Sequence, residues 1–200
     1  MSVFIGITQR VDRDDCYGER RDGIDQRWFD FLALCGVVPV PLPNHLRTVQ
    51  LLLERIDIDG FILSGGGDLV AYGGDAPKRD EVERFLIALA LRRQVPLLGV
   101  CRGMQAIQDY FGVGLHPVQG HIATTHMMNS RDGVNAVNSY HKYGTTGNVP
   151  ELIVTARAED GVVEAIRHKS CRVAGIMWHP ERQLPYAEQD QYMIRQFFAK

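Results

Sequence analysis

Long hydrophobic runs are missing from this 200-residue sequence. A membrane-spanning helix needs about 20 consecutive apolar residues, whereas the apolar stretch at residues 29–43 is interrupted by Gly36 and by three prolines. The N-terminal segment, residues 1–8, is apolar and lacks the basic leader of a signal peptide. We therefore expect a cytoplasmic protein that makes no membrane contact.

An excess of charge is also missing. The chain has 22 Lys and Arg against 24 Asp and Glu, a formal net charge of −2, which argues against a strongly basic nucleic-acid binder and an acidic disordered chain. Cysteine is scarce, with four residues and no Cys-x-x-Cys pair. In a reducing compartment these are expected to be free thiols, not a disulfide framework.

The first half of the chain alternates apolar strands with amphipathic helices, which is typical of a parallel sheet covered on both faces. Strands are expected at 3–8, 37–40, 59–64 and 96–100, and helices at 25–34, 80–90 and 103–111, with one more helix capped by Asn44. Later strands at 152–156, 162–167 and 173–178 have the short spacing of hairpins, and a last helix is expected at 186–198. We expect one α/β domain over residues 1–200, with a mostly parallel central sheet and a C-terminal antiparallel hairpin region.

Cys101 lies in a Gly-x-Cys-x-Gly segment between an apolar strand and a helix. This is the pattern of a nucleophile elbow with Cys in place of Ser. Gly99 and Gly103 leave room for the close backbone approach of the turn. The helix N-terminus favours a thiolate. Cys101 is therefore the candidate nucleophile, rather than a buried small hydrophobic residue.

His179 is the candidate base, because it follows the strand at 173–178 and precedes Pro180 and Glu181. A residue before proline is extended, and alternate residues of an extended segment point to the same side. Glu181 can therefore orient the imidazole of His179. His141 is the competing histidine, and a hydrogen-bonded loop residue near the cleft is its plainer interpretation.

No metal site is expected. His121 and His126 lie five positions apart, with no carboxylate or cysteine at ligand spacing. No cofactor motif is present either, because the triple glycine at 65–67 is not followed by the Gly-Lys-Ser/Thr of a phosphate loop. Those glycines can instead present bare N–H groups to an oxyanion, together with the N–H of Arg102.

Four segments together resemble the signatures of class I glutamine amidotransferase domains, and within them the γ-glutamyl hydrolases. They are Gly99–Gln105, residues 63–67, residues 138–141 (Asn-Ser-Tyr-His) and residues 178–181 (Trp-His-Pro-Glu). The resemblance implies a flavodoxin-like three-layer sandwich, a Cys101–His179–Glu181 triad and an oxyanion hole from the N–H groups of Gly66 and Arg102. It also places Gln105, Ser139, Tyr140 and His141 at the substrate.

The implied reaction is the hydrolysis of a γ-glutamyl amide through a thioester on Cys101. Segments around Arg10, Arg20, Arg21 and Lys78-Arg79-Asp80 resemble one small branch, the γ-glutamyl-CDP-amidate hydrolases of capsule phosphoramidate biosynthesis. That branch implies basic residues at a diphosphate, for which Arg20 and Arg21 are candidates. Their plainer interpretation is a solvated, charge-balanced loop.

Three alternatives remain open from the sequence. The chain can be the glutaminase subunit of a two-chain amidotransferase, a γ-glutamyl-GABA-type hydrolase, or a binding module that has kept the fold. Lys142-Tyr143 after the Asn-Ser-x-His motif departs from the γ-glutamyl-GABA branch. The expected partners are a small γ-glutamyl substrate and either a second copy in a homodimer or a synthase.

Overall fold

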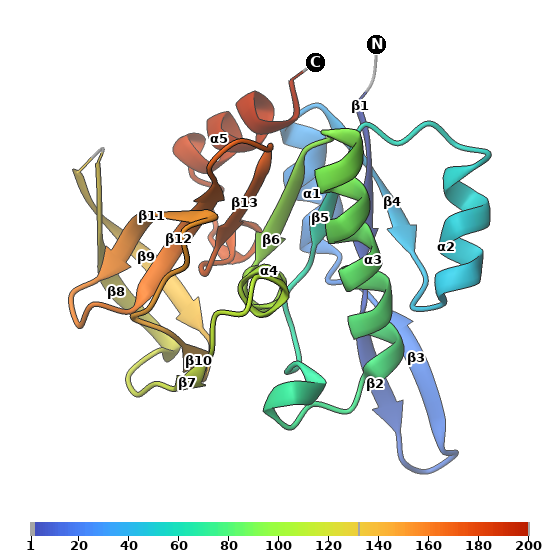
Figure 1. Ribbon diagram of the computed structural model, residues 1–200, viewed down its shortest axis with the longest axis horizontal. Helices are drawn as coiled ribbons and strands as arrows, with labels where there is room; N and C mark the ends of the chain where they lie inside the picture. The colour runs from blue at the N-terminus through green and yellow to red at the C-terminus, as the bar shows by residue number, and fades with distance from the viewer. Residues whose placement is uncertain (1–2, 132, 200) are drawn as a thin grey trace.

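A computed structural model describes residues 3–131 and 133–199 of the chain. A nine-stranded sheet runs through the molecule in the order β4-β1-β5-β6-β13-β12-β11-β8-β9 (Figure 1). The first five strands in this order are parallel: β4 (Val37–Leu42), β1 (Val3–Thr8), β5 (Gly60–Leu63), β6 (Leu97–Val100) and β13 (Val173–Ile176). The α/β class and the mostly parallel core predicted from the alternating pattern are confirmed.

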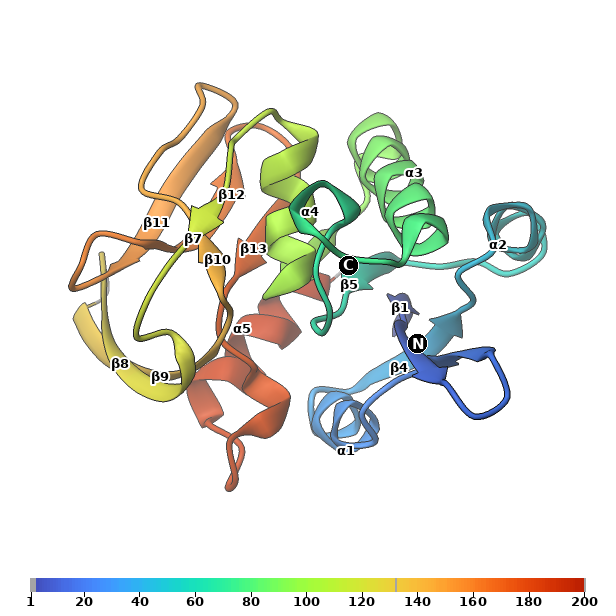
Figure 2. The ribbon, with the colours of Figure 1, turned by 90° about the horizontal axis from the view of Figure 1, so that it is seen from below.

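Helices cover both faces of the parallel strands (Figure 2). One face carries α2 (Leu46–Leu53), α3 (Pro77–Arg93) and α4 (Arg102–Tyr110), whose apolar residues form one core cluster with the sheet. The other carries α1 (Arg27–Leu34) and α5 (Glu188–Phe198), which contribute to a second cluster. Two apolar layers against one sheet make the predicted three-layer sandwich.

Most expected element boundaries differ from the observed ones by a few residues. Helix α3 begins at Pro77, earlier than the expected Asp80, because proline fits the first helical position. Asn44 does not cap α2. The His45 side chain accepts from the N–H of Thr48, and the Asn44 amide instead bonds Asp22 and the carbonyl of Gln9.

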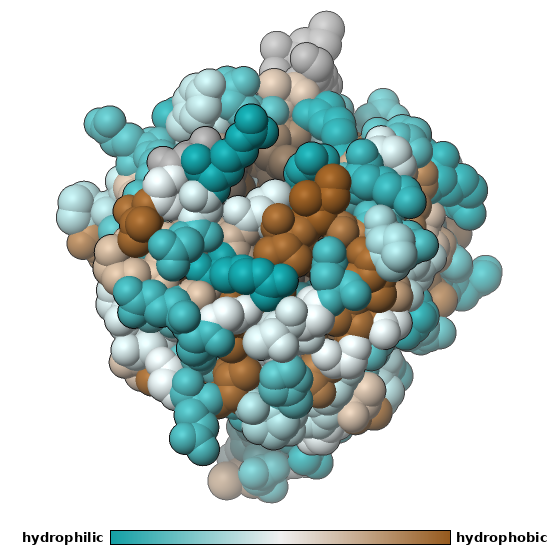
Figure 3. Space-filling model, turned by 60° about the vertical axis from the view of Figure 1, so that its left-hand side comes forward, coloured by the Kyte–Doolittle hydropathy of each residue, from teal (hydrophilic) through white to brown (hydrophobic). Residues whose placement is uncertain are grey.

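The antiparallel half of the sheet is larger than predicted. Strands β11 (Leu152–Ala158) and β12 (Val163–His168) were expected, but the hairpin of β8 (Ile122–Ser130) and β9 (Gly133–Tyr140) was not. A short pair, β7 (His116–Pro117) with β10 (Tyr143–Gly144), lies beside them. Between α5 and this half is an apolar cavity of about 520 Å³, and Figure 3 shows the hollowed surface on this side.

The arginine-rich segment after β1 is a hairpin and not the expected loop. Strands β2 (Arg10–Asp14) and β3 (Glu19–Gly23) pair antiparallel, with Arg13 opposite Arg20. Asp75 offsets this like-charge pair, at 2.9 Å from Arg13 and 3.6 Å from Arg20. The hairpin projects from the carboxyl end of β1 (Figure 1). No helix among the described residues is long and apolar enough to cross a bilayer.

Candidate active site

The carboxyl ends of the parallel strands meet at one edge of the sheet, where open α/β folds place their sites. Cys101 follows β6 directly, and His179 follows β13, the neighbouring strand. The glycine loop at residues 64–67 follows β5 on the other side of β6. The three segments predicted to work together are therefore side by side.

Cys101 occupies a strained elbow, with φ of +52° in a non-glycine residue. It caps α4, and its side chain is buried at 6% exposure. A Cβ on Gly99 would overlap the backbone of Gly103, and a Cβ on Gly103 would overlap the carbonyl of Leu63. The close backbone approach expected at both glycines is thus present in the structure.

His179 connects Cys101 to Glu181. Its Nδ1 lies 2.6 Å from the Oε1 of Glu181, and both side chains are almost fully buried. Burial alone would lower the pKa of His179. Hydrogen bonds to Cys101 and Glu181 outweigh this effect and raise the pKa to about 9. At neutral pH the ring is therefore cationic, so it carries a proton that it can give to a leaving group.

Asn138 holds the backbone of His179 in place. Its amide donates to the His179 carbonyl at 2.9 Å, and its Oδ1 accepts from the His179 N–H at 2.8 Å. The Tyr140 ring packs edge-on against the imidazole, with ring centroids 5.6 Å apart. Strand β9 thus positions the histidine from a hairpin that the periodicity did not reveal.

The glycine loop packs directly on this pair. A Cβ on Gly65 would lie 2.5 Å from Cε1 of His179 and 3.5 Å from Cβ of Cys101, so no side chain fits there. Gly66 has φ of +90°, a conformation that favours glycine. The N–H of Arg102 lies in the first turn of α4, where helix N–H groups have no partner inside the helix.

A buried ion network lies beneath the loop and the elbow, and the sequence pattern did not predict that its members pair with one another. Glu83 and the guanidinium groups of Arg79 and Arg102 are at most 1% exposed. Glu83 pairs with both arginines, and Arg102 also pairs with Asp80. Burial raises the pKa of Glu83, but the two guanidinium groups lower it below its ordinary value.

Arg79 links this network to the glycine loop. Its guanidinium donates to the carbonyls of Ser64 and Gly66, both at 2.6 Å. The sequence pattern grouped residues 78–80 with surface arginines suited to phosphate. Arg79 is instead fully engaged inside the protein, because its donors hold the loop carbonyls and the Glu83 carboxylate.

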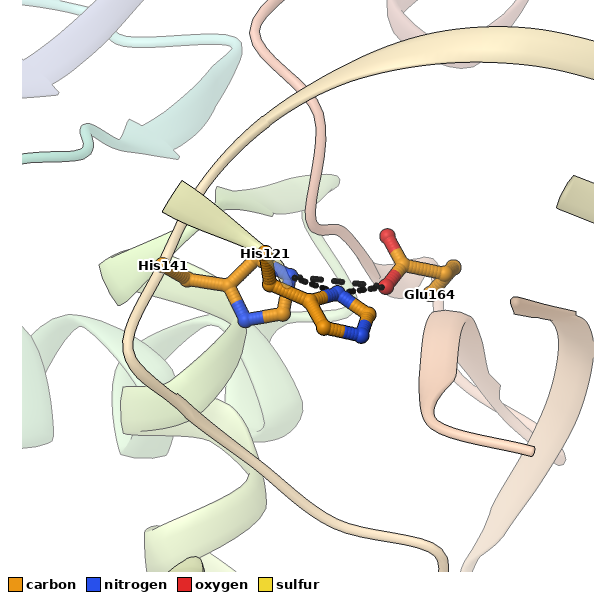
Figure 4. Close-up of side chains that lie close together, drawn as sticks. All are labelled: His121, His141 and Glu164. Carbon is orange, nitrogen blue, oxygen red and sulfur yellow. Dashed lines mark hydrogen bonds and ion pairs between the residues drawn. The ribbon is translucent and has the colours of Figure 1, made fainter. Parts of the chain in front are cut away.

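The structure places the remaining predicted substrate residues in different environments. The Gln105 amide is buried and donates to the Tyr143 carbonyl at 2.9 Å. The Ser139 hydroxyl donates to the carbonyl of His121 at 2.7 Å, which gives Ser139 a structural contact. His141 is buried with His121 and Glu164 (Figure 4).

Neither Arg20 nor Arg21 lines the small cavity beside His179. Arg20 borders a cavity of about 520 Å³ with Lys78, and Arg21 forms ion pairs with Asp14 and Glu19. Two other arginines, Arg10 and Arg182, line the small cavity beside His179 and Glu181. Arg10 lies in a segment that resembled the hydrolase branch, and Arg182 directly follows residues 178–181, but neither was predicted as a site residue.

Comparison with known proteins places the chain in a family. The model of the family described as "Glutamine amidotransferase class-I" matches residues 15–200. The chain belongs to the class-I glutamine amidotransferases. The resemblance inferred from the four motifs is confirmed, and with it the expectation of an enzyme that acts on an amide bond.

The curated relatives include γ-glutamyl hydrolases. The chain is 34% identical over 186 residues to the γ-glutamyl-CDP-amidate hydrolase of Campylobacter jejuni, with 90% of this chain and 91% of that protein covered. It is 29% identical to a γ-glutamyl-γ-aminobutyrate hydrolase of Escherichia coli O157:H7, covering 84% and 82% of the two chains.

Solved structures share the fold. A Thermoplasma acidophilum protein described as a GMP synthase component superposes with a TM-score of 0.75 at 18% identity, covering 99% of this chain and 93% of that one. A glutamine amidotransferase of Thermotoga maritima gives a TM-score of 0.68 at 14% identity, with 98% and 95% covered.

Proposed function

We propose that this protein is a cysteine hydrolase that cleaves γ-glutamyl amides and releases glutamate. The observation that carries the proposal is the continuous arrangement of Cys101, His179 and Glu181 at the sheet edge, directly against the glycine loop. A nucleophile, a base bonded to it and a carboxylate that orients the base are what acyl transfer through a thiol requires.

The proposed reaction has two steps. The Cys101 thiolate attacks the γ-carbonyl carbon, and the N–H groups of Gly66 and Arg102 stabilise the oxyanion. The tetrahedral species collapses when the His179 imidazolium gives its proton to the leaving nitrogen, which leaves a γ-glutamyl thioester. His179 then takes a proton from water, the hydroxide attacks the thioester, and glutamate and the thiol are released.

For the substrate we propose γ-glutamyl-CDP-amidate, which would yield glutamate and cytidine diphosphoramidate. The Campylobacter relative supports this choice. So do Arg10 and Arg182, because guanidinium groups bind phosphate oxygens bidentately, and both line the cavity beside His179. That cavity is only about 30 Å³, enough for about two water molecules. The proposal therefore requires these two side chains to move outward when the leaving group binds.

Glutamate release by the purified chain tests the activity. Glutamine, γ-glutamyl-GABA and γ-glutamyl-CDP-amidate are assayed in parallel, with Cys101→Ala as the blank. Fast release from γ-glutamyl-CDP-amidate alone supports the full proposal, and fast release from another γ-glutamyl amide keeps the reaction and replaces the substrate. If the folded wild-type chain releases glutamate from none of them, the hydrolase proposal fails and a glutaminase subunit that needs a synthase becomes the better interpretation.

Arginine substitutions test the leaving-group site. Arg10→Gln and Arg182→Gln are each expected to raise KM for γ-glutamyl-CDP-amidate about tenfold or more, since a charge-assisted pair contributes about 1.5–3 kcal/mol. The KM for γ-glutamyl-GABA should stay within about twofold. Arg21→Gln is the matched control for Arg10→Gln, because both residues lie on the β2–β3 hairpin. If Arg20 and Arg21 variants raise KM and Arg10 and Arg182 variants do not, the diphosphate lies against β3 instead.

A further inference from the structure

Three donor atoms from distant segments converge in the antiparallel half of the protein (Figure 4). Nδ1 of His121 lies 3.2 Å from Nε2 of His141, and each of these nitrogens lies 3.4 Å from Oε1 of Glu164. All three side chains are buried, with exposures of 3%, 3% and 0%. Two imidazole nitrogens and one carboxylate oxygen thus form a nearly equilateral triangle.

The size of this triangle matches a metal coordination shell. Zinc binds imidazole nitrogen at about 2.0–2.1 Å and carboxylate oxygen at about 2.0–2.2 Å in tetrahedral geometry. Neighbouring ligands of such a tetrahedron are about 3.3–3.5 Å apart, from the bond lengths and the tetrahedral angle. The observed separations therefore fit one face of a zinc tetrahedron.

Hydrogen bonding does not explain the spacing equally well. The His179–Glu181 pair of the same protein closes to 2.6 Å. Around Glu164, His121 and His141 stay 3.4 Å from Oε1, and Nε2 of a third histidine, His126, stays 3.4 Å from Oε2. Among the described residues, neither carboxylate oxygen of Glu164 has a partner in hydrogen-bonding geometry. The His126 Nε2 beside Oε2 is also outside hydrogen-bonding geometry. A fully buried carboxylate without a hydrogen bond is costly unless a cation balances it.

The far side of each imidazole is already held in the orientation that metal binding needs. His121 Nε2 lies 2.9 Å from the carboxylate of Asp160, and the Nδ1–H of His141 donates to the Tyr143 carbonyl at 2.9 Å. Such outer contacts hold the tautomer of metal-binding histidines and aim the other nitrogen at the ion. The two remaining ring nitrogens, Nδ1 of His121 and Nε2 of His141, then face each other at 3.2 Å, with Oε1 of Glu164 beside both.

We propose that His121, His141 and Glu164 bind one divalent transition-metal ion, and that zinc fits the site best. Two imidazoles with one carboxylate suit zinc better than magnesium or calcium, which prefer oxygen ligands. Sequence spacing predicted no metal here. The carboxylate comes from β12, and the second histidine follows β9, so only the folded sheet assembles the three donors.

The ion is structural in this proposal. It cross-links three parts of the chain. His121 directly precedes β8, His141 directly follows β9, and Glu164 lies in β12. The Tyr143 carbonyl that accepts from His141 also accepts from the Gln105 amide, which ties the site to α4 and the elbow. Cys101, His179 and Glu181 do not contribute ligands, so the proposal stands independently of the hydrolase proposal.

Zinc binding to the full chain, purified without a histidine tag, tests the site. Metal-free protein is equilibrated with Zn²⁺, freed of excess metal and analysed for zinc by mass spectrometry. One zinc per chain is expected, with a rise in Tm of about 5–10 °C at a free zinc concentration of 100 times Kd. His121→Gln and Glu164→Gln are expected to weaken zinc binding at least about tenfold. The exposed His116→Gln serves as the control and should bind zinc like the wild type.

Two further measurements separate this site from the thiol–imidazole pair. Cys101→Ala should keep its zinc, and X-ray absorption of the zinc-loaded wild type should show nitrogen and oxygen neighbours at about 2.0–2.2 Å, with no sulfur at about 2.3 Å. The absorption spectrum needs no variant, so it decides even if His121→Gln fails to fold. Sulfur ligation, absence of stoichiometric zinc, or wild-type affinity in folded His121→Gln and Glu164→Gln would overturn the proposal.

Discussion

Replacing Glu83 with Gln should cost the protein much of its stability. The carboxylate is fully buried, accepts from Arg79 Nε at 2.8 Å and from the Thr8 hydroxyl at 2.9 Å, and pairs with Arg102. Glutamine keeps the shape but removes the charge between two buried guanidinium groups. One of its carboxamide positions also becomes a donor that faces other donors.

The size of the effect follows from the cost of an unpaired buried charge. Removing one partner of a buried ion pair destabilises by about 3–5 kcal/mol. For a protein of this length each kcal/mol lowers Tm by about 2–4 °C, so the expected loss is about 6–20 °C. Asp80 still pairs with Arg102, and Arg79 therefore carries most of the cost.

Thermal and urea unfolding at pH 7 measure the change. Glu81→Gln is the matched control, because Glu81 is exposed on the same helix and its substitution should move Tm by no more than about 2 °C. The folded Glu83→Gln protein should also have a lower kcat, since Arg79 holds the loop carbonyls of Ser64 and Gly66. A Tm equal to that of the Glu81→Gln control would refute the reasoning.

Three other perturbations have defined outcomes. The raised pKa of His179, about 9, means that its ion-pair stabilisation is full below about pH 6.5 and is lost as pH rises through about 9. Urea titration of the wild type and of Cys101→Ala measures this loss. The difference between their unfolding free energies should fall over that window and stay constant below it. Gly65→Ala places a Cβ 2.5 Å from the His179 ring and should lower kcat about 100-fold or more, whereas Gly114→Ala, in open space, should leave kcat unchanged. Asn138→Ala removes two hydrogen bonds to the His179 backbone, so kcat should fall about tenfold or more, and wild-type turnover would contradict this role.

Local patterns were enough to predict the parallel half of the fold. Each of its strands is a continuous apolar run, and each run is followed by a helical period, so neighbouring residues carried the signal. The hairpins of β2–β3 and β8–β9 lack such a signal. Their strands are rich in polar and exposed residues. The β8–β9 hairpin joins the edge of the nine-stranded sheet through β11, whereas β2–β3 is a separate sheet with an ion pair between Asp14 and Arg21 across its strands.

The sequence by itself determined the nucleophile, the base and the orienting carboxylate as candidates. Gly99, Cys101 and Gly103 lie within one turn, and His179 and Glu181 lie two residues apart, so backbone geometry relates the members of each set. Only the tertiary structure decided what surrounds them. The Arg79–Glu83–Arg102 network, the Asn138 contact with His179 and the His121–His141–Glu164 cluster join side chains from different elements. Long-range pairs of this kind depend on strand order and packing, which no short segment of sequence contains.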